Sequence, residues 1–136
     1  KQRENNRIDD TLYELVARLT KSTWEITFAC IPSIGTSYYL GLSNYLERHR
    51  WLLGEEMYQG IKCLENKHEF ISLLEDLDIS SRVSAFIGEE NIIPELESST
   101  MIVKKIEVNG YGGYLGILGS TMMDYAYNIT ALRQVL

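Results

Sequence analysis

Five closely spaced glycines offer the first candidate for chemistry, because their density suggests a phosphate-binding loop: Gly110, Gly112, Gly113, Gly116 and Gly119. A dinucleotide-binding loop needs the spacing G-x-G-x-x-G, since its glycines let the backbone approach the phosphates and the next helix. Position 115 is Leu, which breaks that spacing, and no G-K-[ST] follows to complete a Walker motif. We therefore expect these glycines to permit a turn, a bulge or close packing against a neighbouring strand.

Other side chains that could do chemistry also lack the necessary spacing. Neither His49 nor His68 has a second His or Cys three or four residues away, as a helical metal site would require. The acidic residues between positions 89 and 97 have no flanking aromatic platform for a sugar, so a solvated loop is favoured over glycoside hydrolysis. No serine lies in a G-x-S-x-G motif. We expect no enzyme activity, no cofactor and no metal site.

Composition narrows the class of protein further. The chain has 136 residues, of which 45% are hydrophobic and 24% charged, values that suit one globular domain. A net charge of -6 argues against nucleic-acid binding by this chain alone, because a polyanion needs a concentrated basic surface. No apolar run reaches the roughly 18 residues that span a bilayer, and the polar N-terminus does not resemble a signal peptide. We expect a cytoplasmic protein without a membrane partner, and the first residue, Lys1, suggests a fragment of a longer chain.

Cysteines and tyrosines add two weaker indications. Cys30 and Cys63 lie far apart in the sequence, and reduced, buried thiols are favoured over a disulfide. Nine tyrosines are more than such a chain usually has, and they suit either interior packing or a contact surface.

The elements that must position these residues begin with a helix and a strand. After a polar lead-in over 1–9, leucines at positions 12, 15 and 19 predict a helix over about 10–21, which the aspartates at its start could cap. The β-branched and aromatic run 24–31 predicts a strand that Pro32 ends, followed by a loop over 33–37. Residues 38–80 have helical periodicity, with breaks expected at Gly54 and around Asn66.

A hairpin near the C-terminus is the clearest local pattern. Residues 101–108 alternate so that Ile102, Lys104, Ile106 and Val108 share one face, and residues 111–118 form a second strand. Between them stands Asn109-Gly110, the preferred two-residue turn, because both of its central residues need positive φ. A short strand over 82–87 precedes the hairpin, and a helix over about 121–135 follows it. Thr121 and Asp124 have capping-box spacing at the start of that helix. Grouped helices and adjacent strands favour an α+β fold with an antiparallel sheet.

Several of these segments resemble the HrcA repressor family. The segment 87–91, IGEEN, resembles the family's I-G-x-E-N. The segment 116–125, GILGSTMMDY, resembles its G-x-L-G-V-I-G-P-x-R-M-x-Y signature, with Gly119, Met123 and Tyr125 in matching places. Asn128 and Leu132 continue like the family's closing helix. The likeness is good over 80–132 and patchy over 10–78, where GLSNYL at 41–46 resembles G-x-S-N-L-L.

The resemblance implies a reduced, GAF-like regulatory domain over 10–136, an antiparallel sheet with flanking helices. The helical region 38–78 would take the place of the family's dimerisation insert. In the family, such a domain follows a winged-helix domain, and the repressor binds an inverted-repeat operator as a homodimer. The GroEL chaperonin keeps the repressor in its active form. The residues that the resemblance singles out are structural, with no catalytic role: Gly88, Glu90, Asn91, Gly116, Gly119, Met123, Asp124 and Tyr125. The alternative function is a small-molecule sensor, since GAF-like domains often hold ligands in a cleft.

Two departures from the family pattern stand in the closing signature. Ser120 occupies a place where the family has Pro, and Met122 a place where it has Arg. Loss of that Arg removes a charge whose partner would order the loop. The role of this loop in the family therefore does not carry over to this chain.

Overall fold

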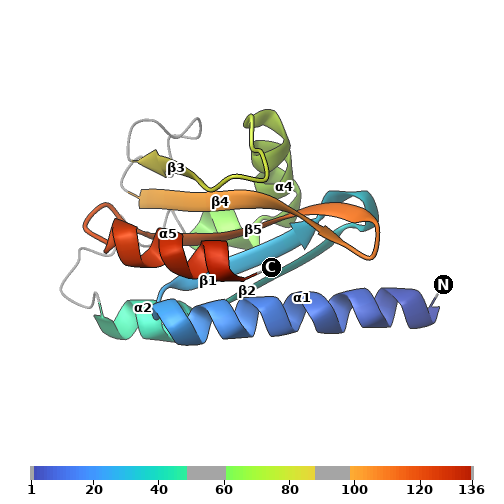
Figure 1. The fold of residues 1–136 in the computed structure, drawn as a ribbon, viewed down its shortest axis with the longest axis horizontal. Coiled ribbons are helices and arrows are strands. Elements are labelled where there is room, and N and C mark those ends of the chain that lie inside the picture. The colour runs from blue at the N-terminus through green and yellow to red at the C-terminus, as the bar shows by residue number, and fades with distance from the viewer. Residues whose placement is uncertain (1, 49–60, 88–98, 136) are drawn as a thin grey trace.

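A computed structural model describes residues 2–48, 61–87 and 99–135 (Figure 1). In chain order the elements are α1 (Gln2–Thr23), β1 (Ile26–Ile31), a 3-10 turn (Pro32–Ile34), β2 (Thr36–Leu40), α2 (Leu42–Arg48), α4 (Lys67–Asp76), β3 (Ser84–Ile87), β4 (Ser99–Val108), β5 (Tyr111–Ser120) and α5 (Tyr125–Gln134). The five strands form one sheet in the order β2-β1-β5-β4-β3, and all the neighbouring strands are antiparallel. This is the α+β, GAF-like arrangement that the sequence predicts.

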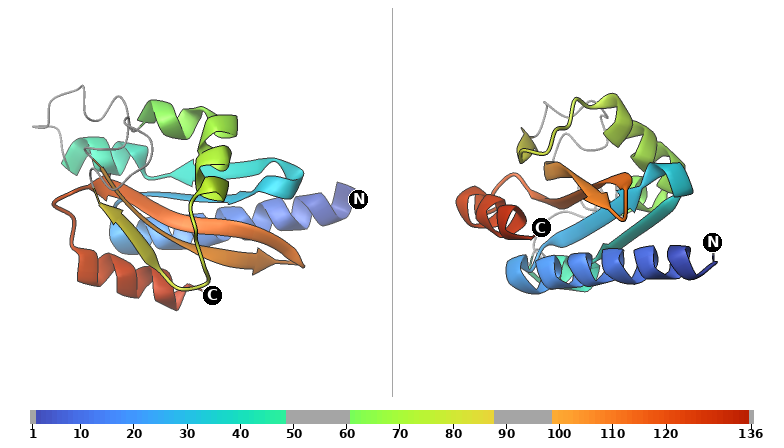
Figure 2. Two further views of the ribbon diagram at one scale, coloured as in Figure 1. Left: turned by 90° about the horizontal axis from the view of Figure 1, so that it is seen from above. Right: turned by 45° about the vertical axis from the view of Figure 1, so that its right-hand side comes forward.

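Helices cover both faces of the sheet (Figures 1 and 2). On one face, α1 and α5 bury a cluster that includes Ile31, Ile102 and Leu115. On the other, α4 packs Phe70 and Leu74 against strand residues of a second cluster. The central strands are buried on both sides as a result, which explains why β1 reads as a nearly continuous apolar run.

Helix α1 is longer than the sequence indicates. It begins at Gln2 rather than near residue 10, so residues 2–9 belong to the helix instead of a solvated lead-in. Ile8 is fully buried, four residues before the equally buried Leu12, and therefore extends the apolar stripe by one turn. The aspartates at positions 9 and 10 lie inside the helix and do not cap it.

Strand β2 corrects the prediction of a loop and then a helix after Pro32. The 3-10 turn ends at Gly35, whose φ of 66° suits glycine, and the chain then pairs back on β1 with Ile31 opposite Thr36. Tyr39 packs on the α4 side of the sheet, whereas Tyr38 and Leu40 pack on the α1 side. Apolar side chains on both faces hide the two-residue alternation by which a strand is recognised.

The rest of the predicted helical region is helical wherever the structure describes it. Helix α2 follows β2, residues 61–65 are helical, and α4 follows Asn66. The Asn66 side chain accepts a hydrogen bond from the Glu69 backbone N–H at 3.4 Å, which makes it the N-cap of α4 and explains the predicted break. The other predicted break, Gly54, lies outside the described residues. The strand predicted over 82–87 is confirmed as β3.

The hairpin is confirmed. Val108 pairs with Tyr111, and the two turn residues, Asn109 and Gly110, have φ of 51° and 86°. Positive φ at both central residues is the geometry of a two-residue type I′ turn, whose twist matches that of the strands. Lys104 lies on the face that packs against α5, as the alternation predicts, and it is buried.

Helix α5 begins three residues later than the capping-box spacing indicates. Asp124, not Thr121, is the N-cap, and its Oδ1 accepts a hydrogen bond of 3.1 Å from the Tyr127 N–H. Met122 therefore lies in the turn before the helix, 89% exposed, and not on its apolar face. In the part of the chain described, no helix combines the length and the apolar character needed to cross a membrane.

Candidate functional site

The end of β5 is shaped by two glycines that the sequence comparison singles out. A Cβ atom on Gly116 would lie 2.5 Å from the Phe28 ring and 2.6 Å from the Ile102 carbonyl oxygen. A Cβ atom on Gly119 would lie 2.7 Å from Glu25 Oε2 and 2.7 Å from the Met123 methyl carbon. Both glycines thus admit side chains from neighbouring elements close to the β5 backbone. The expectation of a packing role is met at these two positions.

The residues after Gly119 connect the sheet to α5. The Tyr125 hydroxyl donates to the Thr121 carbonyl at 2.6 Å and lies 2.9 Å from the Thr100 hydroxyl on β4. The Asn128 amide donates to the Met123 sulfur at 3.4 Å. Farther along, the Tyr127 hydroxyl donates to the carbonyl of Ser22, at the end of α1, at 2.8 Å. These bonds fix the start of α5 beside the junction between α1 and β1.

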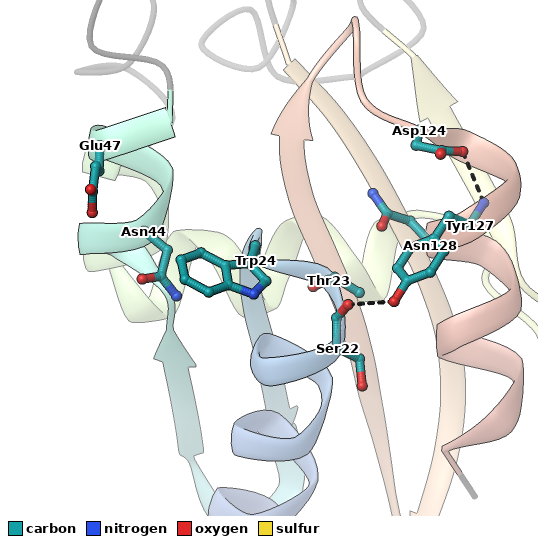
Figure 3. Close-up of a pocket in the computed structure, with 8 residues that line it drawn as sticks. All are labelled: Ser22, Thr23, Trp24, Asn44, Glu47, Asp124, Tyr127 and Asn128. Atoms are coloured by element: carbon teal, nitrogen blue, oxygen red, sulfur yellow. Dashed lines mark hydrogen bonds between the residues drawn. The ribbon is translucent and has the colours of Figure 1, made fainter.

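A cavity of about 490 Å³ opens at this junction (Figure 3). The α1–β1 junction, α2 and α5 supply its lining: Ser22, Thr23, Trp24, Asn44, Glu47, Asp124, Tyr127 and Asn128. Figure 3 shows Asn44 and Glu47 on one side, the Trp24 indole in the middle, and Asp124, Tyr127 and Asn128 at the start of α5 on the other side. A second cavity of about 370 Å³ shares Trp24 and Asn44 with the first and is also lined by Lys21.

Trp24 has an unusual conformation for its size. Its φ is 59°, in the left-handed region where a glycine normally ends a helix, and its N–H donates to the Thr20 carbonyl at 2.8 Å. A bulky residue in this region costs about 1–2 kcal/mol relative to glycine. The indole gains no compensating burial, since it is 56% exposed. This conformation directs an aromatic ring into the space between the two cavities.

The chemistry of the larger cavity is that of a binding site. It presents two carboxylates, Glu47 and Asp124, two aromatic rings and two amides, and none of the eight lining residues is basic. None of them is His, Cys or Lys, so the two carboxylates are the acidic or basic side chains that the described lining presents. Within the described residues, no group of three His, Cys, Asp or Glu is arranged to hold a metal ion.

Two ionisable groups are buried away from this cavity. The Lys104 ammonium donates to the Val135 carbonyl oxygen at 2.8 Å, and desolvation lowers the pKa of Lys104. Cys30 is a buried free thiol whose pKa rises to about 12, first through desolvation and then through the charge of Glu75. A thiol with such a pKa is protonated and unreactive at neutral pH. Cys63 is also buried and forms no disulfide, as expected.

Some of the residues that the sequence singles out lie at the cavity, and others lie elsewhere. Asp124 lines the cavity, and Gly119, Met123 and Tyr125 shape the segment beside it. Gly116 serves packing within the sheet, and Gly88, Glu90 and Asn91 lie outside the described residues. Sequence reasoning missed Trp24, Asn44 and Glu47 as members of one site. The α1–β1 junction and α2 bring these residues to Tyr127 and Asn128 of α5, and no local spacing signals such a set.

Comparison with known proteins identifies a family. The model described as the HrcA protein C-terminal domain matches residues 1–129. The heat-inducible transcription repressor HrcA of Chlorobium phaeobacteroides is 29% identical over 133 residues, which are 92% of this chain and 36% of that protein. The repressor of the same name from Agrobacterium fabrum is 34% identical over 99 residues, which are 68% of this chain and 26% of that protein. The chain spans about a third of the length of the curated relatives it matches.

A solved structure supports the fold. A crystal structure described as that of a hypothetical protein superposes with a TM-score of 0.57 at 18% identity, over 73% of this chain and 29% of that one. At this identity the likeness concerns the fold alone. The family is established by the sequence match over almost the whole chain, and that match includes the β5–α5 segment whose packing is described above. The chain belongs to the HrcA family and corresponds to its C-terminal domain.

Proposed function

We propose that this chain is the regulatory and dimerisation module of a heat-inducible transcription repressor. The observation that carries the proposal is the family match over residues 1–129, together with the repressor names of the relatives. The GAF-like regulatory domain begins with α1 at Gln2 rather than at residue 10, and the region 38–78 takes the place of a longer dimerisation insert. The protein works in the cytoplasm without enzymatic activity.

The module would control DNA binding without touching DNA. Its net charge of -6 repels the phosphate backbone, so a winged-helix domain elsewhere in the repressor makes the contacts. A two-fold dimer of the module sets the spacing of two such domains on an inverted-repeat operator. The GroEL chaperonin assists the active form, and heat withdraws that assistance.

A reporter assay tests this proposal. A reporter gene follows an inverted-repeat operator in cells that express either the full repressor or a version without residues 1–136. We expect the full repressor to silence the reporter at growth temperature and to release it on heating or on GroEL depletion. Loss of this module should abolish repression. Unchanged repression and heat response without the module would refute the regulatory function.

Self-association is tested separately by size-exclusion chromatography with light scattering on the 136-residue chain. A dimer that forms with rising protein concentration supports the dimerisation function. A strict monomer at high concentration would remove dimerisation from the proposal and leave regulation in place.

A small-molecule sensor is the second candidate function, and the cavity at the α1–β1 junction favours it. The cavity volume of about 490 Å³ is in the range of ligand pockets, and its lining combines aromatic surface with a few polar groups. A sensor would couple the occupancy of this cavity to repression. The reporter assay described above detects such coupling when the ligand is added to the cells.

A further inference from the structure

We propose that the cavity between α2 and α5 binds a guanidinium group, either that of a small molecule or an arginine side chain of a partner protein. This inference specifies the ligand class of the sensor function proposed above. It depends on that function only for its regulatory consequence, because binding itself can be measured on the isolated chain.

Charge is the first argument. Glu47 and Asp124 lie on opposite sides of the cavity, and the eight described lining residues include no cation to neutralise them. The basic residue Lys21 lines the neighbouring cavity instead. Asp124 Oδ1 accepts the N-cap bond from Tyr127, which leaves Oδ2 as a free acceptor among the described residues. A cation is therefore the ligand charge that this lining favours.

The aromatic rings are the second argument. Trp24 and Tyr127 both line the cavity, and they are 56% and 54% exposed. The face of an indole or phenol ring attracts a cation, and a planar guanidinium also stacks on it. The left-handed backbone at Trp24 holds the indole at the cavity instead of in the core. The exposure of the indole therefore follows from the backbone conformation at the end of α1.

The third argument is a buried amide. Asn128 is only 3% exposed, and Figure 3 shows its side chain pointing toward the space between α5 and the α1–β1 junction. The one hydrogen bond of its side chain among the described residues is donated by the amide nitrogen to the Met123 sulfur, a weak acceptor. The Asn128 oxygen thus remains able to accept a hydrogen bond from a guest. Buried polar groups in native proteins almost always have such a partner.

These features favour a guanidinium over a simple ammonium ion. A guanidinium carries five N–H donors in one plane, and it can bond a carboxylate and an amide oxygen while its face stacks on an aromatic ring. The cavity offers all three kinds of contact through Asp124, Asn128 and Trp24. A compact ammonium ion would be attracted to the charge and to the ring face, but it has no plane to stack on the ring and no fixed fork of donors for the carboxylate and the amide.

The test measures binding of N-butylguanidine to the 136-residue chain by ¹⁵N NMR and calorimetry. The indole N–H of Trp24, assigned through Trp24→Phe, reports occupancy. N-butylurea, a neutral molecule of almost the same shape, is the matched ligand control. We expect saturable binding of N-butylguanidine with a shift of the Trp24 signal, and no binding of N-butylurea at the same concentration. Equal binding of the two ligands, or binding of neither, would overturn the inference.

Variants locate the site. The double variant Glu47→Gln/Asp124→Asn removes both charges but keeps an N-cap for α5, because Asn caps as well as Asp. It should bind at least about tenfold more weakly, since hydrogen bonds between charged partners are the strong ones. Glu14→Gln, on the exposed side of α1, removes a carboxylate elsewhere and should bind like the unaltered chain. Equal affinity of the double variant and the unaltered chain would exclude this cavity.

Two further ligands distinguish the source of the group. Agmatine represents a free metabolite, and the blocked tripeptide acetyl-Gly-Arg-Gly-amide represents a protein side chain. Tighter binding of agmatine assigns the site to a small molecule, and tighter binding of the peptide assigns it to a partner protein. If agmatine bound to the chain but had no effect in the reporter assay, the sensor function would be refuted and the binding site would remain established.

Discussion

Gly119 and Glu25 are in such close contact that a Cβ atom on the glycine would lie 2.7 Å from the glutamate Oε2. Glu25 is 2% exposed, so this contact lies inside the fold. The same Cβ would also meet the Met123 methyl carbon at 2.7 Å. The glycine thus allows the start of β1 and the turn before α5 to meet over the end of β5. This contact joins the two elements that flank the proposed ligand site.

Alanine substitutions at three glycines of β5 should lower the free energy of unfolding by different amounts, according to the atoms that each new Cβ would contact. Gly116→Ala should be the most destabilising, because it meets the Ile102 backbone carbonyl and the Phe28 ring, which packs edge-on against Phe70. Gly119→Ala should cost less, because side-chain ends can shift. Overpacking of this kind costs roughly 1–3 kcal/mol. Urea unfolding of the purified variants measures the free energy of unfolding.

The matched control for this series is Gly112→Ala. A Cβ atom at Gly112 would meet only the Lys105 Cε, at an ordinary 3.9 Å. We expect a change in unfolding free energy within about 0.5 kcal/mol. If Gly112→Ala were as destabilising as Gly116→Ala, close packing would not explain why glycine occupies these positions.

Lys104 should stabilise the C-terminal end of α5. Its ammonium donates to the Val135 carbonyl, and its stem is buried among the residues that face α1 and α5. Lys104→Ala removes both contacts and should destabilise the chain by roughly 1–3 kcal/mol. Hydrogen exchange at residues 131–135 should become faster. Lys105→Ala, on the exposed face of the same strand, is the control and should change neither quantity.

The hairpin turn allows a test of backbone conformation without any steric clash. Gly110 has a φ of 86°, and a Cβ atom there would have no neighbour within 4 Å. Gly110→Ala should therefore cost only the conformational penalty of the left-handed region, about 1–2 kcal/mol. Asn109→Gly, at a φ of 51°, should change the stability by less than about 0.5 kcal/mol. Thermal unfolding of both variants compares them, and a stable Gly110→Ala variant would contradict the assigned turn.

The elements predicted well from sequence are those whose signals are local. Asn109-Gly110 determines its own turn, and the alternation beside it places Lys104 and Ile102 on one face, as the structure has them. The elements predicted poorly depend on distant partners. Strand β2 carries apolar side chains on both faces because helices cover both sides of the sheet, so its periodicity is concealed. Ile8 extends α1 because β-strand residues lie beneath it, which the polar sequence around it does not indicate.

The candidate site was harder to predict than the fold. The resemblance of its segment to the family signature singles out Asp124, but as a structural residue. The sequence places Trp24 at the start of β1, because an aromatic residue before a β-branched run is typical of a strand. Its left-handed backbone conformation instead directs it toward Asn44 and Tyr127. Residues from the α1–β1 junction, α2 and α5 meet only once the sheet has ordered the chain.

Alkaline pH should weaken the fold through Cys30. The pKa of this thiol is about 12 in the folded chain against an ordinary value of 9.0, because burial and the charge of Glu75 oppose the thiolate. Between those two values the folded state keeps a proton that the unfolded state releases. Stability is therefore complete below pH 9 and falls as the pH rises, by up to about 1.4 kcal/mol per pH unit.

Urea unfolding of the unaltered chain and Cys30→Ala at pH 7, 8, 9 and 10 tests this expectation. Burial also raises the pKa of Tyr38, Tyr39 and Tyr114, but these groups ordinarily titrate near 10.0. The change in stability from pH 9 to 10 is therefore dominated by Cys30. Lys104 has the opposite sign, because its lowered pKa adds stability as the pH rises toward 10.5. The Lys104 contribution is common to both proteins and cancels in their difference. That difference should be constant from pH 7 to 8 and should shift in favour of Cys30→Ala above pH 9. Parallel stability curves up to pH 10 would show that the thiol titrates alike in the folded and unfolded chain.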